Sequence, residues 1–298
     1  KGFFKLKEKK KFEYLNEIGN GLGPTLEFYY LVIDKIRHNE KLWYKTSDLS
    51  LYPTLGLNND LEAIKSFKLL GHIVGRAIYD DRLLDIPISR VLWNILLERP
   101  VLFEDISIFD KDLGKTLLEL KDLANRKHEL LKKDPKITDE ELENKILYNN
   151  KDYLNIKSKY NKKNLDIDFT FPGYNEIELK EGGKDITLTI KNIEEYINLV
   201  YDFLLYKGID KVVRAFREGF CLIYNINHLK CFTSKELEEY ICGSLEIKWD
   251  EDMLYENIKP EHGYTQQSKI FYYIIKFMCS LDKNAQKQFL IFITGTSR

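Results

Sequence analysis

Apolar residues recur at helical spacing in two segments, and this period constrains the fold more than any other feature. The first segment opens with Gly23 and Pro24, and its face consists of Leu26, Tyr29, Tyr30, Ile33 and Ile36. The second begins at Asp60, and its face consists of Ile64, Phe67, Gly71, Val74 and Ile78. Proline suits a first helical position, and Gly71 and Gly75, four residues apart, let a second backbone approach closely. The sequence therefore predicts tightly packed helices.

A period of two residues follows in 175–190, where apolar and polar side chains alternate on both sides of Gly182 and Gly183. Alternation about a glycine turn predicts a β-hairpin between residues 175–179 and 186–190. Asn192 then has the position and chemistry of a helix cap, with Glu195 three residues later as its capping-box partner. The chain is expected to be mainly α with one clear hairpin.

Residues 125–164 differ from the rest of the chain, because they are rich in lysine, glutamate and asparagine and offer few core candidates. This composition favours a low-complexity, flexible insertion. Thr138 and Glu141 have the spacing of a capping box, so a short exposed helix is expected within it.

Charge and cysteine usage exclude several classes of protein. The chain has 46 lysines and arginines against 47 acidic residues, so it lacks a global field that would attract nucleic acid or membranes. The basic run at residues 5–11 is interpreted as a solvated charge run. No apolar run reaches the roughly 18 residues that span a bilayer, and no signal-peptide layout is present. Four cysteines without a CxxC pair favour a reducing compartment, the cytosol or the nucleus.

Four longer motifs carry a specific pattern. They are GLGPTLEFYY at residues 21–30, FKLLGHIVGRAIYDDRLLD at 67–85, PGYNEIELKEGGKDITLTIKNIEEY at 172–196 and TGTSR at 294–298. Together they resemble the amino-terminal lobe of HECT-type E3 ubiquitin ligases, most closely the ubiquitin-fusion-degradation, thyroid-hormone-receptor-interactor-like branch. The resemblance covers nearly the whole chain except the insertion.

The resemblance implies a mainly α fold with a small α+β subdomain, as one lobe of a bilobal domain. A large helical subdomain is expected from residues 1–100 and 207–298. A small subdomain that binds the ubiquitin-conjugating enzyme, E2, is expected from residues 101–206, with the charged insertion at about 125–164. The second lobe, which carries the catalytic cysteine in this family, is expected to lie beyond the chain end.

A ubiquitin-accepting cysteine must present an accessible thiolate. Cys221, Cys231, Cys242 and Cys279 all have apolar or helix-forming neighbours, which predicts small buried side chains rather than nucleophiles. The resemblance matches Cys242 to a cysteine inside the amino-terminal lobe that is not the nucleophile. The alternative is a protease-like dyad of Cys242 and His262, but no supporting motif surrounds either residue. We therefore expect no catalytic residue within the chain.

No metal or cofactor is expected either. His228 and Cys231 share an interval typical of metal ligands, but a second pair at ligand spacing is missing. The acidic clusters at residues 194–195 and 250–252 are interpreted as helix caps or solvated faces rather than acid–base pairs.

In related HECT ligases, an apolar groove in the small subdomain binds two loops of the E2. The resemblance, carried over position by position, assigns to this groove Leu113, Leu117, Leu123, Ile167, Phe169, Tyr196 and Val200. Val200 replaces an aromatic residue found in some relatives, which weakens that contact. Leu113 and Leu117 lie one helical turn apart, as do Tyr196 and Val200, so each pair projects from one face. The same spacing also fits residues that simply bury the core, and this alternative stays open.

The resemblance implies that the parent protein is an E3 ubiquitin-protein ligase, which accepts ubiquitin from an E2 thioester and transfers it to substrate lysines. The 298-residue chain alone is expected to bind E2 and to form no ubiquitin thioester. Its expected partners are E2 and ubiquitin, with protein substrates bound through other regions and no nucleic acid or membrane. The alternative is a non-catalytic protein-interaction module derived from such a lobe.

Overall fold

The structure is a computed structural model that describes residues 23–147, 167–243 and 249–295. The basic run at 5–11, residues 21–22 and 296–298 of the motifs, and residues 148–164 of the predicted insertion lie outside this range. Contacts divide the chain into two compact units. The first unit comprises Lys1–Asn39, Lys68–Pro87 and Phe216–Arg298, and the second comprises Glu40–Phe67 and Ile88–Ala215.

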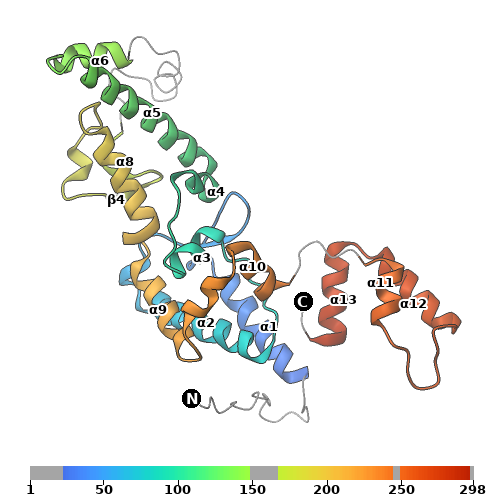
Figure 1. The fold of residues 1–298 in the computed structure, drawn as a ribbon. Helices are drawn as coiled ribbons and strands as arrows, with labels where there is room; N and C mark the ends of the chain where they lie inside the picture. Colours follow the sequence, from blue (N-terminus) through green and yellow to red (C-terminus); the bar gives the residue numbers. More distant parts are fainter. Residues whose placement is uncertain (1–22, 148–166, 244–248, 296–298) are drawn as a thin grey trace. The chain divides into compact units, whose positions relative to one another are not determined.

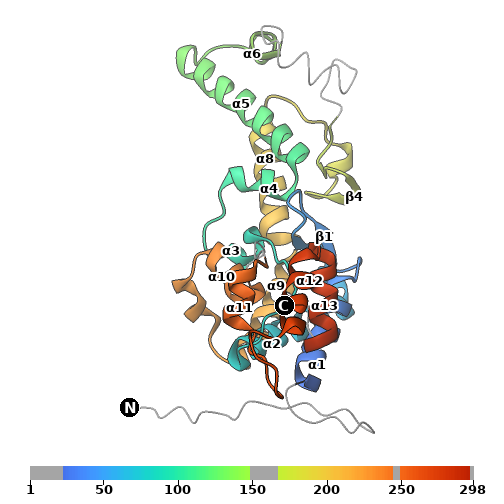
Figure 2. The ribbon, with the colours of Figure 1, turned by 90° about the vertical axis from the view of Figure 1, so that its right-hand side faces the viewer.

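Helices dominate the described residues, as the sequence predicts. The helices of the first unit, together with two that contain the unit boundaries, are α1 (Gly23–Arg37), α2 (Leu61–Asp80), α9 (Asp210–Cys221), α10 (Ser234–Cys242), α11 (Glu251–Asn257), α12 (Lys269–Ser280) and α13 (Lys283–Thr294). Those of the second unit are α3 (Arg90–Leu96), α4 (Ile106–Phe109), α5 (Lys111–Lys133), α6 (Asp139–Leu147) and α8 (Ile193–Asp202). Helices α5 and α8 lie side by side (Figure 1 and Figure 2).

The strands described by the structure all belong to the second unit. They form two antiparallel pairs, β1 (Trp43–Lys45) with β2 (Leu51–Pro53) and β3 (Thr170–Phe171) with β4 (Tyr174–Glu178). Short 3-10 turns occur at Leu57–Asn59, Phe103–Asp105, Gly183–Asp185 and Ile226–Cys231, and a π-helical turn occurs at Phe203–Lys207.

The two units do not coincide with the subdomains expected from the resemblance. Contacts group residues 40–67, 88–100 and 207–215 with residues 101–206, whereas residues 68–87 belong to the first unit. The expected subdomain boundaries at residues 100 and 207 remain a prediction.

The predicted inward faces of the first two helices are largely confirmed. In α1, Tyr29, Ile33 and Ile36 are buried, whereas Leu26 and Tyr30 are half-buried. In α2, the buried members are Phe67, Gly71 and Val74. A helical period therefore located the core side of each helix to within about one residue.

Glycine allows α2 and α9 to touch within the first unit, as the Gly71–Gly75 pair predicts. A Cβ atom added to Gly71 would lie 2.0 Å from the carbonyl oxygen of Phe216. A Cβ atom added to Gly219 would lie 1.9 Å from that of Lys68. Any side chain at either position would push the two backbones apart.

Gly71→Ala is expected to lower the free energy of unfolding by about 1–3 kcal/mol, the usual cost of overpacking a well-packed interior. Urea unfolding followed by circular dichroism measures this change. Gly23→Ala is the matched control, because no atom lies within 4 Å of the added Cβ. Its effect should stay within about 0.5 kcal/mol. Equal stabilities of the two variants would show that the helices do not meet at Gly71.

A buried polar triad joins α1 to α2 in the first unit. The Tyr29 hydroxyl donates to Asp80 Oδ2 at 2.8 Å, and Arg76 Nε donates to the same oxygen at 2.9 Å. Arg76 and Asp80 are both buried. Burial, reinforced by the hydrogen bond to Asp80, raises the pKa of Tyr29 well above its ordinary value. The hydroxyl therefore stays protonated and donates at neutral pH.

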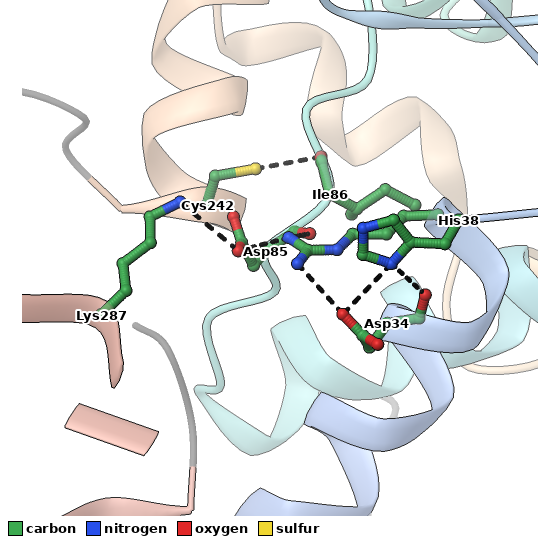
Figure 3. A network of polar contacts seen from close by, with 7 residues as sticks. Asp34, His38, Asp85, Ile86, Cys242 and Lys287 are labelled. Carbon is green, nitrogen blue, oxygen red and sulfur yellow. Dashed lines mark hydrogen bonds and ion pairs between the residues drawn. The ribbon is translucent and has the colours of Figure 1, made fainter. Parts of the chain in front are cut away.

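A second polar network involves α1, the segment after α2, and α13 (Figure 3). Arg37 Nη1 donates to the carboxylate of Asp85 and also to its backbone oxygen, at 3.1 Å. Lys287 Nζ lies 3.7 Å from Asp85 Oδ2. Since Asp85 is buried, these two cations compensate a charge that would otherwise be costly in the interior.

The second unit corrects the predicted hairpin, because β4 pairs with β3 and not with residues 186–190. Residues 167–171 lie between the two segments that were expected to pair. The oxygen of Phe169 accepts from Leu179 N at 2.8 Å, and Leu188 N donates to the oxygen of Ile167 at 2.7 Å. The glycine turn itself is present, with Gly182 at φ +69°. The predicted partner strand was wrong because β3, which pairs with β4, precedes residues 175–190 in the sequence.

Asn192 begins α8 but binds the preceding loop, so the predicted capping box is wrong. Its Oδ1 accepts from Thr189 N at 2.7 Å, and its Nδ2 donates to the oxygen of Thr187 at 3.1 Å. Glu195 instead pairs with Lys180 at 2.8 Å. The asparagine stabilises the loop that enters the helix rather than the first helical turn.

The described part of the predicted insertion, residues 125–147, is mostly helical. Residues 125–133 continue α5, and α6 supplies the predicted short helix, with Glu141 N donating to Thr138 Oγ1 at 3.4 Å. Leu142 and Ile146 are buried, so α6 is only partly exposed. The charged composition reflects the solvated faces of amphipathic helices.

Candidate binding groove

An open groove in the second unit has a volume of about 890 Å³, and eight of its 17 lining residues are aromatic or apolar. We call it the aromatic groove. Its aromatic and apolar residues are Tyr44, Phe109, Leu113, Ile167, Phe171, Pro172, Tyr174 and Tyr196, and its charged residues are Asp110, Asp112, Asp168, Glu176 and Lys184. These residues come from β1, the end of α4, the start of α5, the segment before β3, the β3–β4 hairpin, the 3-10 turn at Gly183–Asp185 and α8. Pockets of this size and character commonly bind ligands or partner side chains.

Asp110 positions one wall of the groove by capping α5. Its Oδ1 accepts from the backbone N–H groups of Asp112 and Leu113, both at 2.9 Å. Its Oδ2 accepts from the Tyr44 hydroxyl at 2.9 Å, and the Tyr44 ring stacks on Phe109 with centroids 4.6 Å apart. Burial and then the bond to Asp110 raise the pKa of Tyr44 to about 12. The hydroxyl thus holds the wall together as a neutral donor.

The β3–β4 hairpin forms another wall. Gly173 has φ +82°, a conformation that favours glycine, and it allows the tight turn between the strands. Phe171 and Tyr174 are backbone partners across the pair, with ring centroids 5.9 Å apart. Burial, with the nearby charge of Glu176, raises the pKa of Tyr174 above its ordinary value. The hairpin therefore presents neutral aromatic surface to the groove.

The structure brings three of the seven predicted E2-binding residues to the aromatic groove. Leu113, Ile167 and Tyr196 line it. The other four are buried outside the lining, and they are Leu117, Leu123, Phe169 and Val200. For these four, the geometry favours the core role that spacing alone left open.

Phe169 shows how such a core residue supports the groove. It is 0% exposed and packs edge-on against Tyr196, with ring centroids 5.4 Å apart. Tyr196 in turn lines the groove. The phenylalanine therefore acts on the groove through the position of the tyrosine.

Sequence reasoning missed several aromatic lining residues. The run FTFPGY at residues 169–174 carried a signal for Phe171 and Tyr174, because three aromatic residues surround a proline–glycine turn. Tyr44 gave no such signal, since its hydrogen-bond partner Asp110 lies 66 residues away in the sequence. Only the fold brings these parts of the groove together.

The four cysteines have different environments. Cys242 is buried, and its thiol donates to the backbone oxygen of Ile86 at 3.2 Å (Figure 3). Cys279 is half-buried, and desolvation raises the pKa of its thiol. Cys221 and Cys231 are exposed, so the prediction that all four are buried is wrong for these two.

His262, the candidate partner of Cys242, is exposed at a turn with φ +56°, whereas the Cys242 thiol is buried. Within residues 23–147, 167–243 and 249–295, no group of three or more His, Cys, Asp and Glu side chains is arranged to hold a metal ion. None of the described helices combines the length and apolarity needed to cross a membrane.

Comparison with known proteins gives a consistent result. The family model for the HECT-domain (ubiquitin-transferase) matches residues 30–298. The chain is 31% identical to E3 ubiquitin-protein ligase TRIP12 of Danio rerio, over 97% of this chain and 15% of that protein. It is 31% identical to E3 ubiquitin-protein ligase UPL3 of Arabidopsis thaliana, over 96% of this chain and 16% of that protein. It is 32% identical to Ubiquitin fusion degradation protein 4 of Saccharomyces cerevisiae, over 97% of this chain and 19% of that protein.

The chain therefore spans less than a fifth of the length of each of these relatives. The match covers almost all of its own residues, and the relatives belong to the branch that the four motifs indicate. The chain is a member of the HECT-domain (ubiquitin-transferase) family.

Proposed function

We propose that this chain is the E2-docking lobe of a HECT-type E3 ubiquitin ligase. The whole protein would accept ubiquitin from an E2 thioester and pass it to lysines of substrate proteins, in the reducing cytosol or nucleus. Two of its relatives carry the name E3 ubiquitin-protein ligase, which supports the transferase assignment. The observation that carries the docking role is the aromatic groove of the second unit.

The chemistry of the groove suits a brief encounter between proteins. Its accessible apolar surface includes Ile167 and Tyr174, which are half-buried and so retain area that a partner can cover. One apolar side chain from an E2 loop, inserted among these residues, would supply much of the binding free energy. An enzyme that must release each discharged E2 benefits from a small interface with fast dissociation.

The environments of the cysteines support a division of labour in which this chain docks E2 and another region accepts ubiquitin. The Cys242 thiol is buried and donates to the oxygen of Ile86, so it is not accessible to a thioester. The Cys231 thiol donates to the oxygen of His228 at 3.1 Å. Desolvation raises the pKa of Cys279, which disfavours its thiolate. We therefore expect the chain alone to form no ubiquitin thioester.

Ile167→Ala is expected to weaken E2 binding about tenfold, because it removes apolar area that a partner would bury in the groove. Isothermal titration of the 298-residue chain against a panel of E2 enzymes measures this change. Ile177→Ala is the matched control, since Ile177 is also half-buried in the second unit but does not line the groove.

Loss of binding in Ile167→Ala, with binding kept in Ile177→Ala, would support docking at the groove. If the native chain bound no E2, the alternative of a non-catalytic interaction module would replace this proposal. Binding that is equal in both variants would place the E2 elsewhere on the chain.

A further inference from the structure

Four carboxylates and one ammonium group line the aromatic groove, and two of the carboxylates are engaged inside the protein. Asp110 accepts three hydrogen bonds, from the α5 amides and from Tyr44. Asp168 Oδ1 accepts from Thr170 N at 3.0 Å and also from the Thr170 hydroxyl. These two residues build the walls and offer little to a partner.

Asp112 and Glu176 are the remaining carboxylates. Both are exposed, and neither carboxylate forms a hydrogen bond or an ion pair with another described residue. Lys184 does not compensate them, because its Nζ lies 3.7 Å from Glu178 Oε1. The groove therefore combines an apolar interior with two uncompensated negative charges, which we call the acidic rim.

We infer that the acidic rim selects E2 enzymes whose docking loop carries lysine or arginine beside its apolar anchor. This inference rests on the proposed docking function and specifies the chemistry of the partner. A lysine or arginine can lay its aliphatic stem along the groove while its charged end reaches Asp112 or Glu176. The ring of Tyr174 adds a surface on which such a cation can stack.

Exposed charges of this kind act on selectivity more than on total affinity. An exposed ion pair contributes little on its own, but complementary charges speed association and like charges across an interface are costly. An E2 with an acidic residue beside its anchor would meet two carboxylates on the rim. Discrimination between basic and acidic docking loops therefore comes from repulsion as well as attraction.

The test is a charge-reversal cycle between the 298-residue chain and an E2 that binds it. Affinities are measured for the native chain, Asp112→Lys, Glu176→Lys and the double variant, at about 50 mM and about 300 mM salt, because screening weakens exposed charges. Glu129→Lys is the matched control, an exposed acid on α5 outside the groove. Asp112→Asn with Glu176→Gln removes the charges without reversing them.

The double reversal should weaken binding about tenfold at low salt and by less than about threefold at high salt. Replacing the basic residue of the E2 loop with glutamate should restore much of the loss, and the neutral double variant should lose about threefold. Glu129→Lys should bind as the native chain does. Equal affinities of the native chain and the double reversal would contradict E2 selection by the acidic rim, but not E2 docking itself. Absence of binding to every E2 would instead contradict the docking function, and with it this inference.

Discussion

Asp80→Ala is expected to lower the free energy of unfolding by about 3–5 kcal/mol, the usual cost of removing one partner from a buried ion pair. The change leaves the Arg76 guanidinium buried without the carboxylate that accepts its Nε hydrogen bond. It also leaves the Tyr29 hydroxyl without the acceptor 2.8 Å away. Urea unfolding at neutral pH measures the loss. The slope of the unfolding free energy against urea concentration is compared between variants, because an unchanged slope means that only stability has changed.

Glu62→Ala is the matched control for Asp80→Ala, because it removes a carboxylate from the same helix at an exposed position. Glu62 pairs with Lys65 at 2.8 Å, with both side chains largely in solvent. Such a pair contributes at most about 1 kcal/mol, so the control should be close to native stability. A loss below about 1 kcal/mol for Asp80→Ala would mean that the triad does not hold α1 to α2.

Phe169→Ala is expected to lower the free energy of unfolding by about 3–5 kcal/mol, as truncation of a large aromatic side chain in a core usually does. The ring is fully buried against Tyr196, and Lys180 Nζ lies 4.2 Å from its centroid. The backbone of Phe169 also bonds to the segments on both sides of it, through Leu179 and Ile186. Its removal should therefore loosen the hairpin and the groove together.

Thermal and urea unfolding distinguish this core role from a direct contact with the partner. Tyr174→Ala is the comparison, since Tyr174 is half-buried and lines the groove itself. It should lose E2 binding with a much smaller loss of stability than Phe169→Ala. If Phe169→Ala kept native stability and lost only binding, Phe169 would be a contact residue and not part of the core.

The contrast between Leu113 and Leu117 shows where sequence reasoning stops. The two leucines lie one turn apart on α5, and spacing correctly assigns both to the inward side. In the structure Leu113 is 8% exposed at the groove, whereas Leu117 is 1% exposed in the core. Helical period identifies the side that faces protein, but it does not say whether a groove interrupts that side.

Contacts between distant parts of the chain were equally hard to predict. The β3 strand that pairs with β4 follows the charged insertion, so the local alternation of residues 175–190 pointed to the wrong partner. The glycine contact of Gly71 was predictable because its signal is local, a small residue on an apolar helical face. Cys221 was misjudged because its neighbours are apolar, whereas burial depends on which side of α9 a residue occupies.

The central claim is that E2 binds in the aromatic groove, and methyl NMR tests it most directly. Isoleucine and leucine methyl groups of the 298-residue chain would be followed while an E2 is added. The largest shifts are expected at Ile167 and Leu113, which line the groove, with Ile33 and Ile36 in the first unit unchanged. Shifts concentrated at Ile33 and Ile36, or none with any E2, would contradict docking at this site.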